Sequence, residues 1–196
     1  MEPIILASSS PRRQEILKML KIPFRVIIPN IDETLKSAID LEQIPELLAR
    51  EKVTAVIHSL PSHQEIPYVL GADTVIIFNN EIMGKPESQE QAFEYLKKLQ
   101  GKTHTVVTAL VLYKGKTKTT VSKINKTRVT FSPMTDEEIQ WYVDTGEWHG
   151  AAGGYRIQSL ASMFVAKIEG SYTGVVGLPI SDLYDILKEQ EYSVLE

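Results

Sequence analysis

The sequence contains no cysteine, which excludes disulfide bonds, thiolate nucleophiles and cysteine-ligated zinc sites. It also lacks an apolar run long enough to cross a bilayer, and Met1-Glu2-Pro3 offers no basic start for a signal peptide. A basic surplus is missing too, because 21 Lys and Arg stand against 25 Asp and Glu, a net charge of −4. Broad nucleic-acid-binding surfaces are usually basic. We therefore expect a cytoplasmic protein with no nucleic-acid partner and no membrane partner.

Common nucleotide-binding and metal-binding signatures are absent as well. Neither G-x-x-x-x-G-K-[ST] nor G-x-G-x-x-G occurs in the chain. The histidines show neither H-E-x-x-H nor zinc-ligand spacing, and we interpret them as ordinary surface or core residues: His58, His63, His104 and His149. Any phosphate site in this chain must therefore be built in another way.

The apolar residues are distributed along the whole chain. They make up 43% of 196 residues, which predicts one folding unit over residues 1–196 with a sizeable core. Strand and helix patterns alternate and predict an α/β fold with a mixed sheet flanked by helices. We expect strands at 4–7, 24–28, 69–78, 105–113, 116–131 and 164–168, and helices after residue 10 and at 45–61, 88–99, 135–143 and 181–190.

Two details of this pattern bear on function. The strand at 69–78 carries Gly71-Ala72-Asp73-Thr74 at its centre, which predicts an interruption there, and Asn79-Asn80 predicts a hairpin turn directly after it. Residues 30–40 are expected to form a polar loop with Asp32 and Glu33.

The N-terminal turn is the strongest local signal. Ser8-Ser9-Ser10 follows the first strand and precedes a helix whose first turn carries Arg12 and Arg13. Free backbone N–H groups and the helix dipole attract anions at such a turn. Cations are mildly unfavourable there, so the two arginines suggest a phosphate opposite them. The alternative is that both are solvated surface arginines.

Other charged residues have simpler explanations when each is taken alone. Lys52 could lie on a solvated helix face, Lys85 in a surface turn and Glu33 in a polar loop. Asp73 differs, because an aspartate inside a strand opposes strand propensity and is costly to bury without a partner. Its alternative role is a structural hydrogen bond.

Several motifs together resemble the Maf family of nucleoside triphosphate pyrophosphatases. They follow the family's order from residue 4 to residue 180, and the ordered set is far more specific than any single motif. The motifs are Ala7-Ser8-Ser9-Ser10-Pro11-Arg12-Arg13, Asp32-Glu33-Thr34, Ala49-Arg50-Glu51-Lys52, Gly71-Ala72-Asp73-Thr74, Gly84-Lys85-Pro86, Gly153-Gly154-Tyr155-Arg156-Ile157-Gln158, Gly170-Ser171-Tyr172 and Val176-Gly177-Leu178-Pro179.

This resemblance implies an elongated central sheet with two lobes around a cleft, related to inosine triphosphate pyrophosphatases. It also implies a hydrolase of nucleotide metabolism that cleaves between the α- and β-phosphates with a divalent cation, Mg²⁺ or Mn²⁺. The implied role is house-cleaning, the removal of excess or non-standard nucleotides. The resemblance is compatible with a homodimer.

The resemblance also assigns roles to individual residues. Ser8 and Arg13 would bind the substrate, Lys52 and Lys85 would offset phosphate charge, and Asp73 would accept a proton from water. Glu33 would orient the water, and Glu33 and Asp73 would hold the metal.

Base specificity is expected to depend on Arg12, Thr74 and Gln158, at which the chain resembles the dTTP/UTP pyrophosphatase branch. A glutamine amide can pair with both N3–H and O4 of thymine or uracil. Family members often carry lysine at Ala151 and glycine at Arg156 and Ser159, so these residues could reshape the base pocket, and Arg156 could add a contact.

Three alternatives stay open at this point. Two are pyrophosphatases for 7-methyl-GTP or for inosine triphosphate, which differ in nucleobase preference. The third is a non-catalytic nucleotide-binding regulator of cell division, which the joint presence of the basic cluster and Asp73 disfavours.

Overall fold

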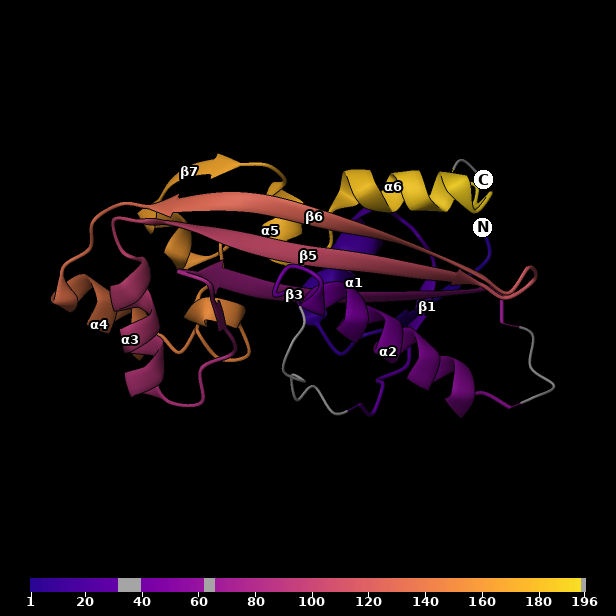
Figure 1. Cartoon of the computed structure of the whole chain (residues 1–196), viewed down its shortest axis with the longest axis horizontal. Coiled ribbons are helices and arrows are strands. Elements are labelled where there is room, and N and C mark those ends of the chain that lie inside the picture. The colour runs from indigo at the N-terminus through magenta and orange to yellow at the C-terminus, as the bar shows by residue number, and fades with distance from the viewer. Residues whose placement is uncertain (32–39, 62–65, 195–196) are drawn as a thin grey trace. The chain divides into compact units, whose positions relative to one another are not determined.

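The computed structural model describes residues 1–31, 40–61 and 66–194, and their strands and helices alternate along the chain (Figure 1). The strands are β1 Ile4–Ala7, β2 Phe24–Val26, β3 Tyr68–Phe78, β4 Glu81–Met83, β5 Thr103–Lys114, β6 Thr119–Phe131 and β7 Val165–Glu169. The helices are α1 Pro11–Met19, α2 Ile44–Ser59, α3 Gln89–Leu99, α4 Asp136–Asp144, α5 Tyr172–Val176 and α6 Ile180–Glu189, with short 3₁₀ helices η1 Ala152–Gly154 and η2 Leu160–Phe164.

The described strands form a seven-stranded sheet in the order β2-β1-β3-β5-β6-β7, with β4 paired to β3. Strand β1 is parallel to both β2 and β3, whereas β3 is antiparallel to β4 and β6 is antiparallel to β7. The predicted α/β fold with a mixed sheet is therefore confirmed. No helix among the described residues is long and apolar enough to span a bilayer.

The chain forms two compact units, each built from separate stretches of sequence. Unit 1 comprises residues 1–73, 108–125 and 177–196, and unit 2 comprises residues 74–107 and 126–176. Three of the four boundaries fall inside β3, β5 and β6, and the fourth directly follows α5. Each unit is described below by itself, and a single folding unit over residues 1–196 stays a prediction.

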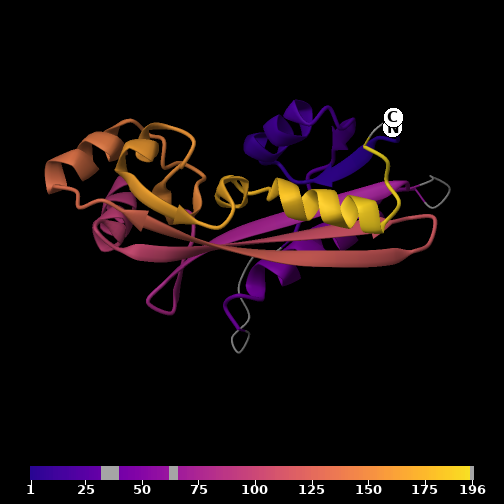
Figure 2. The ribbon, with the colours of Figure 1, turned by 90° about the horizontal axis from the view of Figure 1, so that it is seen from above.

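The core of unit 1 lies between the sheet and α2. Apolar side chains of the strands pack there against one face of the helix: Ile5, Ala7, Val69 and Val111 against Ala49, Val53 and Val56. Helix α1 lies on the opposite face of this part of the sheet (Figure 2). The helical spacing of Ala49, Val53 and Val56 accounts for the close match between the expected helix at 45–61 and α2.

The core of unit 2 gathers around α3 and α4. Leu96 of α3 and Ile139 of α4 are buried there with Phe131, Trp148 and Tyr155. The start of α4 is fixed by a capping box, in which Thr135 Oγ1 accepts from the Glu138 N–H and the Glu138 carboxylate accepts from the Thr135 N–H. This confirms the helix start expected from the sequence.

Two details of the strand pattern were wrong. Strand β3 runs without interruption from Tyr68 to Phe78, because packing of α2 over Gly71 outweighs the low strand propensity of residues 71–74. Strand β6 begins at Thr119 instead of residue 116, because the hairpin turn takes up residues 115–118, with Lys118 at φ 53°. The predicted turn at Asn79-Asn80 is confirmed, and both residues have positive φ.

Candidate active site

The turn between β1 and α1 is organised around the Ser8 side chain. Ser8 is buried, and its Oγ accepts hydrogen bonds from the Ser10 N–H at 3.2 Å and from Arg13 Nη1 at 3.0 Å. Arg13 Nε also donates to the Gly177 carbonyl at 2.8 Å. Arg13 is thus a buried, oriented cation at the start of α1, and the alternative of a solvated surface arginine is wrong for it. Arg12 is half-buried.

Lys52 of α2 and Asp73 of β3 form a buried ion pair. The distance between Lys52 Nζ and Asp73 Oδ1 is 2.5 Å, and the two side chains are only 9% and 12% exposed. Val69, Gly71 and Asp73 share one face of β3, the face that α2 covers, since side chains alternate along a strand. The pairing compensates the burial of two charges, each of which would be costly alone.

Gly71 determines how closely α2 approaches β3. A Cβ atom at residue 71 would lie 2.6 Å from the Ala49 carbonyl oxygen and 2.6 Å from Val53 Cγ2, closer than any real contact. A residue with a side chain there would push the helix outward and draw Lys52 away from Asp73. The glycine that suggested a broken strand is instead a site of close approach.

The serine turn and the ion pair are carried by neighbouring strands, the turn directly after β1 and Asp73 in the middle of β3. Strands β1 and β3 are parallel, with Ala7 opposite Gly71, so Ser8 and Asp73 both follow this pair toward the carboxyl ends. Both belong to unit 1. The structure joins four of the predicted residues in two separate contacts, Ser8 with Arg13 and Lys52 with Asp73.

Of the remaining predicted residues that the structure describes, Arg12 belongs to unit 1, and Thr74, Lys85 and Gln158 belong to unit 2. Thr74 is half-buried and, by strand alternation, faces the side of β3 opposite to Asp73. Lys85 and Gln158 are exposed. Their two segments are neighbours, because the Gly153 N–H donates to the Gly84 carbonyl at 2.9 Å.

The predicted metal ligands are only partly described. Glu33, with the rest of Asp32-Glu33-Thr34, lies outside the described residues, whereas Asp73 is at the buried pair. Within the described ranges, no group of three His, Cys, Asp or Glu side chains could hold a metal ion by itself.

Sequence reasoning did not single out the polar contacts in the core of unit 2. His104 of β5 is buried, and its Nε2 lies 2.7 Å from the Tyr155 hydroxyl. Burial lowers the pKa of His104 to about 4, so the ring is neutral at neutral pH, and burial raises the pKa of Tyr155. The interpretation of His104 as a core histidine is therefore confirmed.

Fold and site together define a class: a mixed α/β protein whose cationic turn and buried lysine–aspartate pair suit a phosphate-bearing ligand. The profile of the family described as Maf-like protein matches residues 3–190. The chain belongs to the Maf family, which confirms the resemblance seen in its motifs.

Similar proteins cover nearly the whole chain. A dTTP/UTP pyrophosphatase of Desulforamulus reducens is 45% identical over 188 residues, 96% of each chain. One of Pelotomaculum thermopropionicum is 42% identical over 100% of both chains, and one of Thermosipho africanus is 47% identical over 94% of this chain and 91% of the other. Among solved structures, the Staphylococcus aureus Ham1 protein matches with a TM-score of 0.42 and 17% identity, covering 66% of this chain and 72% of that one.

Proposed function

We propose that the protein is a pyrophosphatase that hydrolyses dTTP and UTP to the nucleoside monophosphate and pyrophosphate, within the cytoplasmic nucleotide pool. The observation that carries the proposal is the buried Lys52–Asp73 ion pair. Its support from the comparisons is the name dTTP/UTP pyrophosphatase, borne by relatives that match nearly the full chain.

The chemistry requires cations around the phosphates and a carboxylate near the attacking water. Arg13 and Lys52 would supply positive charge, and Lys85 would add more. Asp73 would accept the proton of the water, and its ion pair with Lys52 holds the carboxylate in one orientation. Glu33 would orient the same water.

A divalent cation such as Mg²⁺ or Mn²⁺ is the proposed cofactor. Mg²⁺ is usually held by one or two carboxylates together with substrate phosphates, not by an all-protein cage. Asp73 and Glu33 would provide these carboxylates. When bound, the cation would neutralise phosphate charge and polarise the scissile phosphoanhydride.

The first test is the identity of the product. We expect the protein to release pyrophosphate from dTTP and UTP, with EDTA abolishing the reaction and Mg²⁺ or Mn²⁺ restoring it. Phosphate should become detectable only after inorganic pyrophosphatase is added to the mixture. Orthophosphate as the first product would overturn the assigned reaction. Full activity after metal removal would overturn the requirement for a divalent cation. A nucleotide panel with CTP, inosine triphosphate and 7-methyl-GTP separates the competing pyrophosphatases.

Base selection is proposed to depend on Arg12, Thr74 and Gln158. Gln158 is exposed, and its amide offers an acceptor for N3–H and a donor for O4 of the pyrimidine ring. A carboxylate at this position would face O4 without a proton to share. The amide is thus the group that suits a thymine or uracil edge.

Gln158→Glu is expected to lower kcat/KM for dTTP and UTP by about tenfold or more, because a polar group that the bound base covers and leaves unpaired costs about 1–3 kcal/mol. Hydrolysis of 7-methyl-GTP should fall less or rise. Steady-state kinetics on dTTP, UTP, CTP and 7-methyl-GTP measure this, with Gln89→Glu at the exposed start of α3 as the matched control. An unchanged order of preference would show that Gln158 does not contact the base.

A further inference from the structure

Gln158 stands at the exposed tip of a turn whose other residues are anchored. The turn is closed by the Ser159 N–H, which donates to the Arg156 carbonyl at 3.1 Å. Tyr155 and Ile157 are buried, and Ile157 belongs to the core of unit 2. The backbone on either side of Gln158 is therefore tied down while its own side chain is exposed.

The downstream side of this turn is held by one carboxylate. Glu147 Oε1 accepts from the Ser159 hydroxyl at 2.8 Å, and Glu147 Oε2 accepts from the Leu160 N–H at 3.1 Å. These are the two residues that follow Gln158, and both bonds are charge-assisted, which makes them stronger than neutral ones. The Glu147 side chain thus binds the Ser159 side chain and the Leu160 backbone, directly after Gln158.

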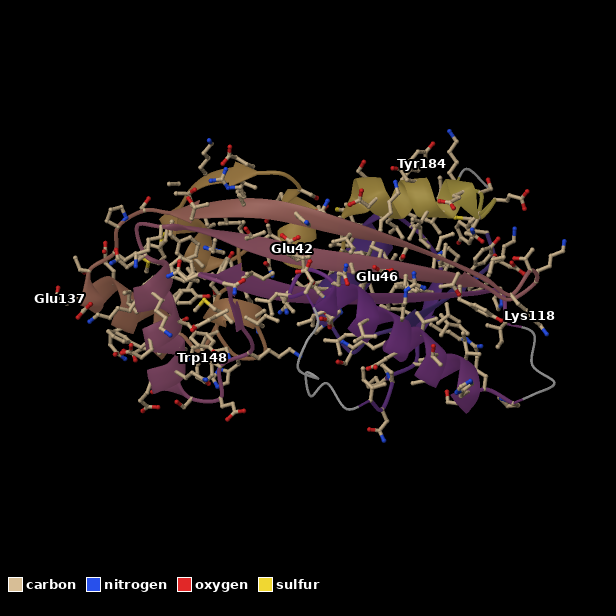
Figure 3. The ribbon with its side chains drawn as sticks, in the orientation of Figure 1. Glu42, Glu46, Lys118, Glu137, Trp148 and Tyr184 are labelled. Atoms are coloured by element: carbon tan, nitrogen blue, oxygen red, sulfur yellow. The ribbon has the colours of Figure 1, made fainter. Side chains whose placement is uncertain are left out.

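Glu147 is itself fixed to the end of α4. Its N–H donates to Thr145 Oγ1 at 3.3 Å, and that hydroxyl donates to the Tyr142 carbonyl at 2.6 Å. The next residue, Trp148, labelled in Figure 3, is buried and donates from Nε1 to the Val143 carbonyl at 3.1 Å. The carboxylate therefore extends from a rigid base.

The upstream side is held by the same region of unit 2. The Arg156 N–H donates to the Tyr142 hydroxyl at 3.2 Å, and Arg156 Nη2 donates to the His149 carbonyl at 2.8 Å. The pKa of Tyr142 is raised to about 12, chiefly by burial, so its hydroxyl stays neutral and can accept this bond. Arg156 therefore helps to anchor the turn.

We propose that Glu147 is a positioning residue for base selection, which holds the turn so that the Gln158 amide meets the pyrimidine edge. This inference rests on the proposed function and on the role of Gln158 within it. Hydrogen bonds to a base edge need donor–acceptor distances near 2.9 Å, and a displacement of about 1 Å can cost about 10²-fold in rate. Glu147 touches Gln158's neighbours, and its effect reaches the base only through Gln158.

The experiment compares Glu147→Ala and Glu147→Gln with Glu137→Ala, an exposed glutamate of α4 labelled in Figure 3. We expect Glu147→Ala to reduce the preference for dTTP over CTP in kcat/KM by about tenfold, mainly through KM. Glu147→Gln keeps one acceptor oxygen and should restore part of the preference. Glu137→Ala should match the wild type.

Two further measurements separate positioning from general destabilisation. Glu147→Ala/Ser159→Ala should discriminate no worse than Glu147→Ala, because the two residues share one hydrogen bond. Amide hydrogen exchange at Leu160 should accelerate in Glu147→Ala and stay unchanged in Glu137→Ala.

The outcomes are distinct. Equal losses for dTTP, UTP and CTP, or an unchanged rate of exchange at Leu160, would overturn the positioning role of Glu147 while leaving the proposed function intact. A wild-type protein that releases no pyrophosphate from dTTP or UTP would instead overturn the proposed function, and the specificity role with it.

Discussion

Asp73→Asn is expected to lower kcat for dTTP by ~10²–10⁴-fold, the usual cost of losing a general base. The substitution keeps the size of the side chain but leaves an amide that cannot accept a proton from water. The change should appear in kcat at saturating dTTP, measured as pyrophosphate release, because Asp73 is proposed to act on the attacking water and not on the base.

Asp136→Asn provides a matched control. Asp136 also pairs with a lysine, Lys97, at 2.8 Å, but this pair is exposed at the start of α4. Its amide variant should retain the wild-type kcat. If Asp73→Asn is folded by circular dichroism and turns over dTTP at nearly the wild-type rate, Asp73 is structural and another group activates the water.

The largest effect on stability is expected at the same ion pair. Lys52→Met and Asp73→Asn should each lower the free energy of unfolding by about 3–5 kcal/mol, because each leaves one buried charge without its partner. The double variant Lys52→Met/Asp73→Asn should lose clearly less free energy of unfolding than the sum of the two single losses, because it buries no unpaired charge. Urea denaturation of the wild type and the three variants gives the coupling free energy.

The exposed pair again supplies the comparison. Lys97→Met, Asp136→Asn and their double variant should change the free energy of unfolding by no more than about 1 kcal/mol, because solvent screens exposed pairs. Additive costs for Lys52→Met and Asp73→Asn would mean that the two charges do not depend on each other. Burial is the property that this comparison isolates.

Local patterns in the sequence were sufficient for most of the elements. The periodicity of residues 45–61 predicted α2, the Thr135 and Glu138 spacing predicted the cap of α4, and Asn79-Asn80 predicted the hairpin. Each of these patterns involves only a few neighbouring residues, and those residues form the helix face, the cap or the turn themselves. The resemblance to a family added the joint assignment of Lys52 and Asp73.

Contacts between residues far apart in sequence could not be predicted. The hydrogen bond from Arg13 to the Gly177 carbonyl joins residues that are far apart in the sequence. Neither of the two motifs indicates that the other contains its partner. Glu147 lies in a glycine-rich stretch with no sign that its carboxylate bridges to Ser159 and Leu160. Gly71 does mark a special position, but strand propensity alone predicted an interruption of the strand there, whereas the glycine allows the close approach of α2.

The close fit of α2 over Gly71 favours a single register of β3 during folding. A shift of β3 by one residue would exchange the two faces of the strand, turning Asp73 away from Lys52 and placing Leu70 or Ala72 beneath Ala49 and Val53. Neither side chain fits the space that the glycine leaves open. A misaligned chain therefore cannot pack α2 in place, and Asp73 pairs with Lys52 only in molecules that have folded in the correct register.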